Sequence, residues 1–83
     1  MQPFQESAPH RLIVREMTAR HMTYDALEAA TGLPKLALAL VIAGEAPITA
    51  EVAAGLERAF GSDAGIWLRL QEQRDKWRDM RHG

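Results

Sequence analysis

Residues 23–44 read TYDALEAATGLPKLALALVIAG, and this stretch decides the expected fold. It holds two runs of helix-forming residues separated by a short turn around Gly32. Thr23 is a suitable N-cap for a first helix over Tyr24–Thr31, which the glycine ends. A second helix is expected over Pro34–Ala43, because proline is favoured in the first turn of a helix. Two helices joined by so short a glycine-containing turn are typical of a helix-turn-helix.

The second of these runs is ambiguous, because the alternation over Leu36 to Ile42 also fits a β-strand. Leucine and alanine favour a helix, however, and Gly44 supplies a stop at its end. No partner strand is evident elsewhere in the sequence. We therefore expect this run to be helical.

Capping residues and glycines outside this stretch predict three further helices, which makes five in an all-α chain. Their ranges are Pro9 to about His21, Ala50–Phe60, and about Ala64 to Arg81. Thr49 is a suitable N-cap for the middle one, preceded by Ile48 as a hydrophobic staple, and Ser62 or Asp63 caps the last. The expected organisation is a flexible N-terminal segment (1–8), a helix-turn-helix domain (9–61) and a C-terminal helix (62–83).

Composition limits the class of protein. The chain has 83 residues, no cysteine and a formal charge of −1, from 10 Lys and Arg against 11 Asp and Glu. One small domain without disulfides or a cysteine-based zinc site suits a reducing cytoplasm. The longest apolar run, Leu36–Ala43, is far shorter than the roughly 20 residues of a membrane span, and the N-terminus lacks the features of a signal peptide. We expect a cytoplasmic protein with no membrane contact.

No arrangement of residues predicts catalysis. The histidines, His10, His21 and His82, are too far apart in sequence for a metal-ligand spacing and are expected on the surface. Acidic residues of the last helix alternate with Arg and Lys, which is typical of a solvated face. We find no Ser-His-Asp order, phosphate-binding loop or cofactor motif, so we expect neither an enzyme nor a cofactor or metal.

The order of these features resembles a known family. The stretches that resemble the XRE-type helix-turn-helix domain are Met22-Thr23-Tyr24 to Gly32, then Gly44 through Ile48-Thr49-x-Glu51-x-Ala53-x-x-Leu56. Those that resemble its HigA-like antitoxin branch are Phe60-Gly61 and Trp67-Leu68-x-Leu70-Gln71 followed by Asp75 and Trp77. The resemblance covers roughly residues 8–80. It implies a homodimeric, DNA-binding transcriptional regulator, the antitoxin of a HigB-type ribonuclease pair, which presents Pro34–Ala43 to DNA.

Alignment on the two glycines places Leu38 and Val41 on the core side of this helix. The residues then expected at DNA are Thr23, Pro34, Lys35, Leu36, Ala39 and Leu40, with Ala37 also facing the groove. Further phosphate contacts are expected from Thr31 and Arg20. Within the helix only Lys35 can hydrogen-bond to a base through its side chain, since Ala and Leu reach only thymine methyl groups. Direct readout of sequence is therefore expected to be weak.

Leu36 and Leu40 leave two interpretations open. If they are exposed, they form an apolar patch suited to protein contact. If the alignment misplaces the face, they belong to the core, since a helix that is apolar on all sides is usually buried. The first interpretation suggests an alternative function, a helix-turn-helix-fold interaction module that has lost sequence-specific DNA binding and uses this helix to bind a protein partner.

Trp67 is expected to fill the core beside Phe60. The resemblance implies that the last helix takes part in dimer formation. The residues expected at that interface are Ile66, Leu70, Trp77 and Met80. Glu28 occupies a position where the family has a small alanine between the two helices. We expect a modest shift in helix packing there, with the carboxylate reaching solvent.

Overall fold

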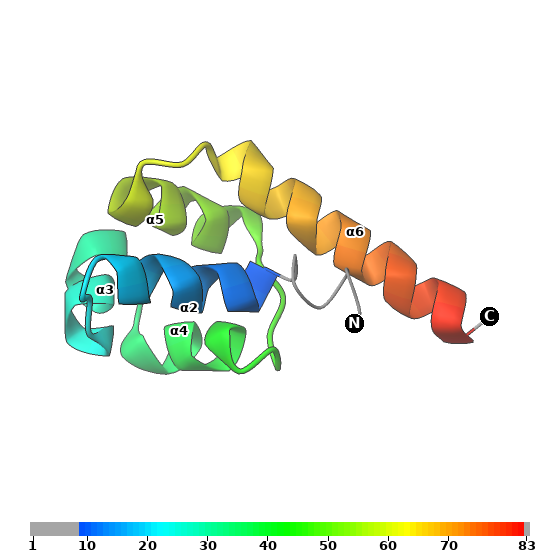
Figure 1. The fold of residues 1–83 in the computed structure, drawn as a ribbon, viewed down its shortest axis with the longest axis horizontal. Helices are drawn as coiled ribbons and strands as arrows, with labels where there is room; N and C mark the ends of the chain where they lie inside the picture. The colour runs from blue at the N-terminus through cyan, green and yellow to red at the C-terminus, as the bar shows by residue number, and fades with distance from the viewer. Residues whose placement is uncertain (1–8, 83) are drawn as a thin grey trace.

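The computed structural model describes residues 9–82, with side chains as far as residue 76. Within this range the chain forms α-helices and no strand, so the all-α class is confirmed (Figure 1). The helices are α2 (Pro9–Ala19), α3 (Tyr24–Thr31), α4 (Lys35–Ile42), α5 (Ala50–Phe60) and α6 (Ala64–His82). The ambiguous alternating run is α4, a helix. The N-terminal segment 1–8, predicted to be flexible, lies outside the described residues.

The ends of α3 and α5 follow the predicted capping. The hydroxyls of Thr23 and Thr49 each accept a hydrogen bond from the backbone amide three residues further on, at 3.1 and 3.3 Å. Gly32 and Gly61 close these helices with φ angles of 76° and 78°, in the left-handed region that favours glycine. Local sequence therefore determines where both helices begin and end.

The ends of α2 and α4 differ slightly from the prediction. Pro34 is the N-cap of α4 rather than its first helical residue, and Ala43 is the C-cap. Helix α2 ends at Ala19, two residues before His21, which has a positive φ of 52°. A left-handed residue cannot continue a right-handed helix, so α2 must stop before it.

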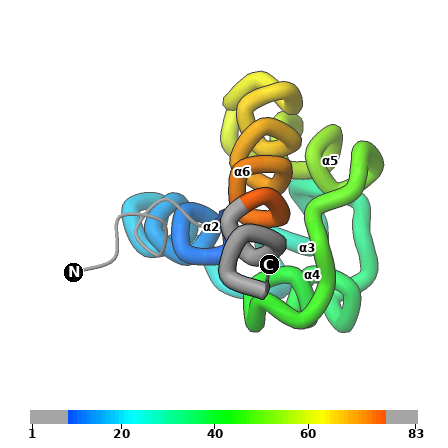
Figure 2. The backbone as a smooth tube through the Cα atoms, turned by 90° about the vertical axis from the view of Figure 1, so that its right-hand side faces the viewer, coloured from blue at the N-terminus to red at the C-terminus, as the bar shows by residue number. Residues whose placement is uncertain are grey.

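The helices surround one hydrophobic core. In Figure 1, α2 lies in front of α5, α3 crosses the left end, α4 lies below, and α6 runs along the top and continues past the other helices. Figure 2 shows the first half of α6 between α2 and α5. Trp67 of α6 is buried in the core, with its ring centroid 6.0 Å from that of Phe60, as predicted.

Helix α5 packs directly against the turn between α3 and α4. A Cβ added at Gly55 of α5 would lie 2.9 Å from Leu33 Cδ1 and 3.3 Å from the backbone oxygen of Thr31. A side chain at this position would require Leu33 to move and the turn backbone to give by a few tenths of an ångström, so a glycine suits this close approach. Arg58, one turn further along α5, donates a hydrogen bond to the same Thr31 oxygen. Helix α5 thereby fixes the position of the turn, and the turn places α4 at the edge of the bundle.

Candidate interaction face on helix α4

Helix α4 has one buried side and one exposed side. Leu38 and Val41 are 1% and 4% exposed and belong to the core, as predicted. Leu36 is 74% exposed and Leu40 41%. The interpretation that these two leucines belong to the core is therefore wrong, because their side chains lie on the opposite side of the helix from the one that packs. The exposed apolar patch is confirmed.

The N-terminus of α4 is capped by a side chain from α3. The Oε2 atom of Glu28 accepts a hydrogen bond from the backbone amide of Lys35 at 2.9 Å. This amide is one of the helix-end donors that have no partner within the helix, and the partial positive charge there favours a carboxylate. The bond lies at the surface, which agrees with the prediction that the Glu28 carboxylate reaches solvent. The position of this carboxylate gives α4 a cap that its own preceding residue, Pro34, cannot supply.

Lys35, the only cation in α4, is paired within the molecule. Its ammonium group forms an ion pair with the carboxylate of Asp25 in the first turn of α3. The hydrogen bond to Asp25, together with the charge of that carboxylate, raises the pKa of Lys35 above its ordinary value. Both side chains are largely exposed, so the pair contributes little to stability. A phosphate that approaches Lys35 must nevertheless displace or tolerate Asp25.

The remaining residues predicted at DNA lie around this helix end. Thr23 and Pro34 are exposed at the starts of α3 and α4, whereas Ala39 is half-buried. The structure therefore brings the predicted set together on one side of the molecule. Whether DNA is bound there stays a prediction.

Two further residues expected to contact phosphate are engaged within the molecule, Thr31 in the interior and Arg20 at the surface. Thr31 is fully buried; its hydroxyl donates to the Leu27 carbonyl at 2.8 Å and accepts from the Leu33 amide at 3.2 Å. The phosphate role predicted for Thr31 is therefore wrong. Arg20 donates to the Phe60 carbonyl at 3.1 Å and lies over the Phe60 ring, which ties the end of α2 to the end of α5.

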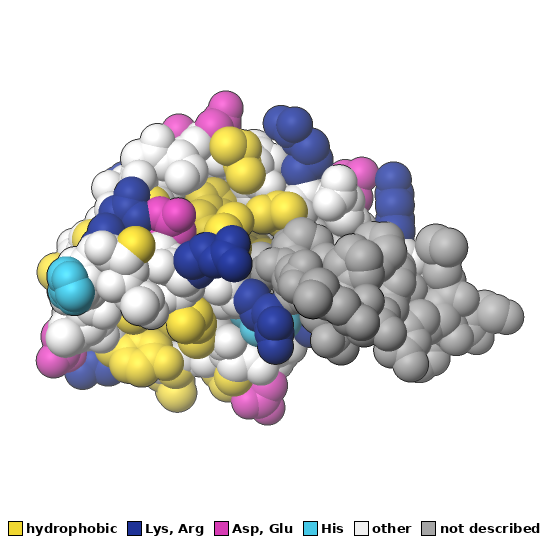
Figure 3. Space-filling model, in the orientation of Figure 1, with side chains coloured by type: hydrophobic (Ala, Val, Ile, Leu, Met, Phe, Trp, Pro, Cys, Tyr) yellow, Lys and Arg dark blue, Asp and Glu magenta, His cyan; other side chains and the backbone are white. Residues whose placement is uncertain are grey.

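Charge is divided unevenly between the two sides of the molecule. Residues 23–51, which include α3, α4 and the loop to α5, contain four acidic residues and one lysine, a net charge of −3. Residues 9–22 contain three arginines and one glutamate, a net charge of +2. Figure 3 shows hydrophobic side chains over α4 at the lower edge, with acidic side chains to either side. The segment that carries α4 is therefore acidic, while the guanidinium groups of Arg58 and Arg74 lie near Gly32 and Gly44 at its two ends.

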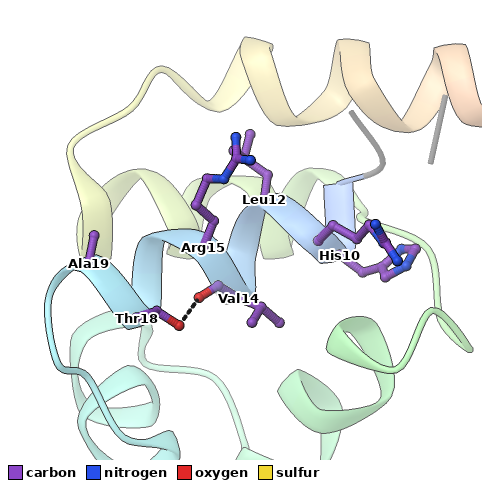
Figure 4. Close-up of a pocket in the computed structure, with 7 residues that line it drawn as sticks. His10, Leu12, Val14, Arg15, Thr18 and Ala19 are labelled. Carbon is purple, nitrogen blue, oxygen red and sulfur yellow. Dashed lines mark hydrogen bonds between the residues drawn. The ribbon is translucent and has the colours of Figure 1, made fainter. Parts of the chain in front are cut away.

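The basic side includes a hollow along α2 (Figure 4). Its lining consists of seven residues of this single helix, His10, Arg11, Leu12, Val14, Arg15, Thr18 and Ala19. The Thr18 hydroxyl donates to the Val14 carbonyl at 2.9 Å, so it is already used within the helix. Because all of the lining comes from one helix, the hollow is an open surface depression rather than an enclosed site.

The C-terminal stretch that carries the antitoxin resemblance has a structural role. Gln71 is buried, and its Oε1 atom accepts a hydrogen bond from the amide of Ile48 at 2.9 Å. This bond joins α6 to the loop before α5. Of the residues predicted at a dimer interface, Ile66 is exposed and Leu70 is partly buried against the core. The side chains of the other two, Trp77 and Met80, lie outside the described residues.

His10 is half-buried, so the prediction that it lies free on the surface is wrong. Arg74 Nη1 lies 2.9 Å from His10 Nδ1. Since arginine can only donate, the ring nitrogen accepts and His10 is neutral in this contact. Burial, and secondarily the charges of Arg74 and Arg11, lower the pKa of His10 below its ordinary value. His21 is exposed, as predicted, and His82 lies beyond the described side chains.

Among the described residues, no three His, Asp or Glu side chains come together in a way that could hold a metal ion. No described helix combines the length and the apolar character needed to cross a membrane. No protein-family model, no curated protein and no solved structure matches the chain.

Proposed function

We propose that this chain is a helix-turn-helix protein of the XRE type. The arrangement of α3 and α4 supports this proposal. The two helices are joined by Gly32, Leu33 and Pro34, and the glycine takes the left-handed conformation that the turn needs. Helix α2 precedes the pair, and α5 packs against the turn and supports it from inside.

Its function, on this proposal, is that of a HigA-like antitoxin that also regulates transcription. The observation that carries it is the position of α4, buried on one side and projecting from the bundle on the other. In a helix-turn-helix protein the second helix of the pair lies in the major groove. The C-terminal stretch from Trp67 to Gln71 adds support, since it packs α6 onto this domain.

The exposed side chains limit how such a protein would contact DNA. Lys35 is the only cation of α4, and Leu36 and Leu40 offer base edges nothing but apolar contact. Binding would therefore rest on phosphate contacts by Lys35, Thr23 and backbone amides. We expect weak affinity, a small salt dependence and little discrimination between sequences.

A salt titration tests the DNA-binding part. Binding of a labelled random-sequence duplex, followed by fluorescence anisotropy, should weaken as salt increases, and Lys35→Ala should reduce the salt slope by about one. Lys76→Ala is the matched control, because Lys76 is also ion-paired, with Glu72 at 3.4 Å, but lies on α6. If the duplex does not bind at low salt, the DNA-binding part of the proposal is wrong.

The antitoxin part has its own test. It requires a small basic ribonuclease encoded beside this gene, and co-expression of this chain should suppress the growth arrest that the ribonuclease causes. Unchanged arrest on co-expression would contradict an antitoxin role even if the chain binds DNA.

A second candidate is a protein-interaction module on the same fold without sequence-specific DNA binding. The specific observation in its favour is the chemistry of the α4 N-terminus. Glu28 occupies the backbone amide of Lys35, and Asp25 pairs with the lysine side chain. The side chain and the backbone amide of Lys35, which could both attract a phosphate, are thus paired with carboxylates of the same molecule.

A further inference from the structure

We propose that the exposed side of α4 binds a protein surface that has an apolar centre and a rim of Lys and Arg. This inference rests on the second candidate function and specifies the partner by its chemistry. Three properties of the α4 face carry it: its apolar centre, its acidic surroundings and the pairing of its only cation.

The apolar centre consists of Leu36 and Leu40, which lie four residues apart and hence on one side of the helix. Leu36 is the most exposed of the large hydrophobic side chains in the described residues. Isolated exposed leucines are common, but two on one helix face form a contiguous contact area. Covering that area removes apolar surface from water, which favours association.

Acidic side chains lie at both ends of α4, and at the C-terminal end the Arg74 guanidinium lies beside Gly44. Asp25 and Glu28 lie at its N-terminal end, and the Asp25 side chain is 77% exposed. Glu45 lies at its C-terminal end, where its backbone amide donates to the Leu40 carbonyl at 2.9 Å. Glu51 is exposed in the first turn of α5.

Complementary charge selects the partner. A surface whose net charge over residues 23–51 is −3 attracts cationic groups and repels phosphates. The Lys35 ammonium offsets little of this charge, since Asp25 is paired with it. A partner with an apolar centre can cover the two leucines, and its cationic rim can pair with the carboxylates. The phosphates of a DNA duplex would be repelled by those carboxylates.

Two synthetic peptides test the inference. Both are amphipathic helices with the same leucine stripe; one carries Lys beside the stripe and the other Glu. The isotope-labelled chain is titrated with each, and its amide NMR signals are followed. The Lys-flanked peptide should shift the signals of residues 35–45, and the Glu-flanked peptide should not. Leu36→Ala with Leu40→Ala should weaken binding by about tenfold or more, given what the burial of two leucines contributes.

Controls separate the apolar and the charged contributions. Leu68→Ala removes an exposed leucine of α6 and should leave binding unchanged. Glu45→Gln with Glu51→Gln should weaken binding of the Lys-flanked peptide, and more so at low salt than at high salt. Neither glutamate takes part in an ion pair in the described structure, so these changes should not disturb the fold.

Several outcomes would overturn the inference. They are failure of the Lys-flanked peptide to bind at low salt, equal binding of both peptides, or shifts confined to α6. If Leu36→Ala converts a dimer to a monomer in sedimentation experiments, a second copy of the chain occupies the face instead. If duplex DNA shifts the same signals at lower concentration than the peptide, the face is a DNA surface. That last result would support the first proposed function while contradicting this one.

Discussion

Leu36 and Leu38 stand two residues apart on α4, yet the first is exposed and the second is buried. The residue types on the two sides of this helix are nearly the same, and only the packing against α2 and α3 distinguishes them. A leucine on the buried side stabilises the fold, whereas one on the exposed side is available to a partner. Residue type alone does not reveal which of these roles a leucine has.

The largest effect on stability is expected from the buried side. Leu38→Ala leaves a cavity in the core, and the free energy of unfolding should fall by about 2–5 kcal/mol. Denaturant unfolding followed by circular dichroism measures this change. A loss below about 0.5 kcal/mol, the usual size for a surface position, would show that Leu38 is not a core residue.

The start of α4 should give the next largest effect. Glu28→Ala removes the acceptor for the Lys35 amide and should lower the free energy of unfolding by about 0.5–2 kcal/mol, the range of helix N-caps. Glu28→Gln keeps an acceptor but removes the charge, so its effect should be smaller. Equal losses for the two variants in the same unfolding experiment would indicate that the carboxylate charge, rather than the hydrogen bond, matters.

The contact between His10 and Arg74, beside Gly44 at the end of α4, should make stability depend on pH. Just beyond the helix, a Cβ at Gly44 would lie 3.6 Å from the His10 ring and 3.5 Å from the Arg74 guanidinium. Since the fold lowers the pKa of His10, the unfolded chain binds the proton more readily. This contribution to stability should be complete above pH 6.5, the ordinary pKa of histidine. It should be lost as the pH falls through the lower pKa that His10 has in the folded protein.

Thermal unfolding across this pH range measures the effect of His10. His10→Gln should remove the acid-dependent part, and His21→Asn, at an exposed histidine with positive φ, should leave it in place. An unchanged pH dependence in His10→Gln would assign the effect to another group.

The exposed side should give the smallest effect on stability. Leu36→Ala removes a side chain that is mostly in water already, so the free energy of unfolding should change by no more than about 0.5 kcal/mol. The same denaturant experiment as for Leu38→Ala makes the two values directly comparable. A loss similar to that of Leu38→Ala would mean that both sides of α4 are buried in solution, for example between two copies of the chain.

Sequence patterns predicted the helices well because the signals for their ends are local. Thr23, Gly32, Thr49 and Gly61 act within a few residues of their own positions, so no knowledge of the fold is needed to interpret them. Alignment on the flanking glycines predicted that Leu38 and Val41 belong to the core, but the sequence left open whether Leu36 and Leu40 are exposed. Burial of Trp67 beside Phe60 was predicted from the positions of the aromatic residues along the last helix.

The errors concern contacts between distant residues. Glu28 reaches an amide seven residues away, and His10 meets Arg74 across 64 residues; both depend on how helices cross. A phosphate contact is expected of Thr31 from its place beside the turn, but the close approach of Gly55 covers this residue. The residues next to each of these positions give no indication of the contacts they make. A glutamate in place of a small residue was the single signal that pointed to one of them.

The close approach of Gly55 to the turn also has an evolutionary consequence. Because the turn is supported from beneath, the outer residues of α4 can be exchanged without disturbing the helices that present them. Descendants of this sequence could thus acquire new partners by substitution at positions 36 and 40, whereas a side chain at position 55 would require Leu33 and the turn to shift.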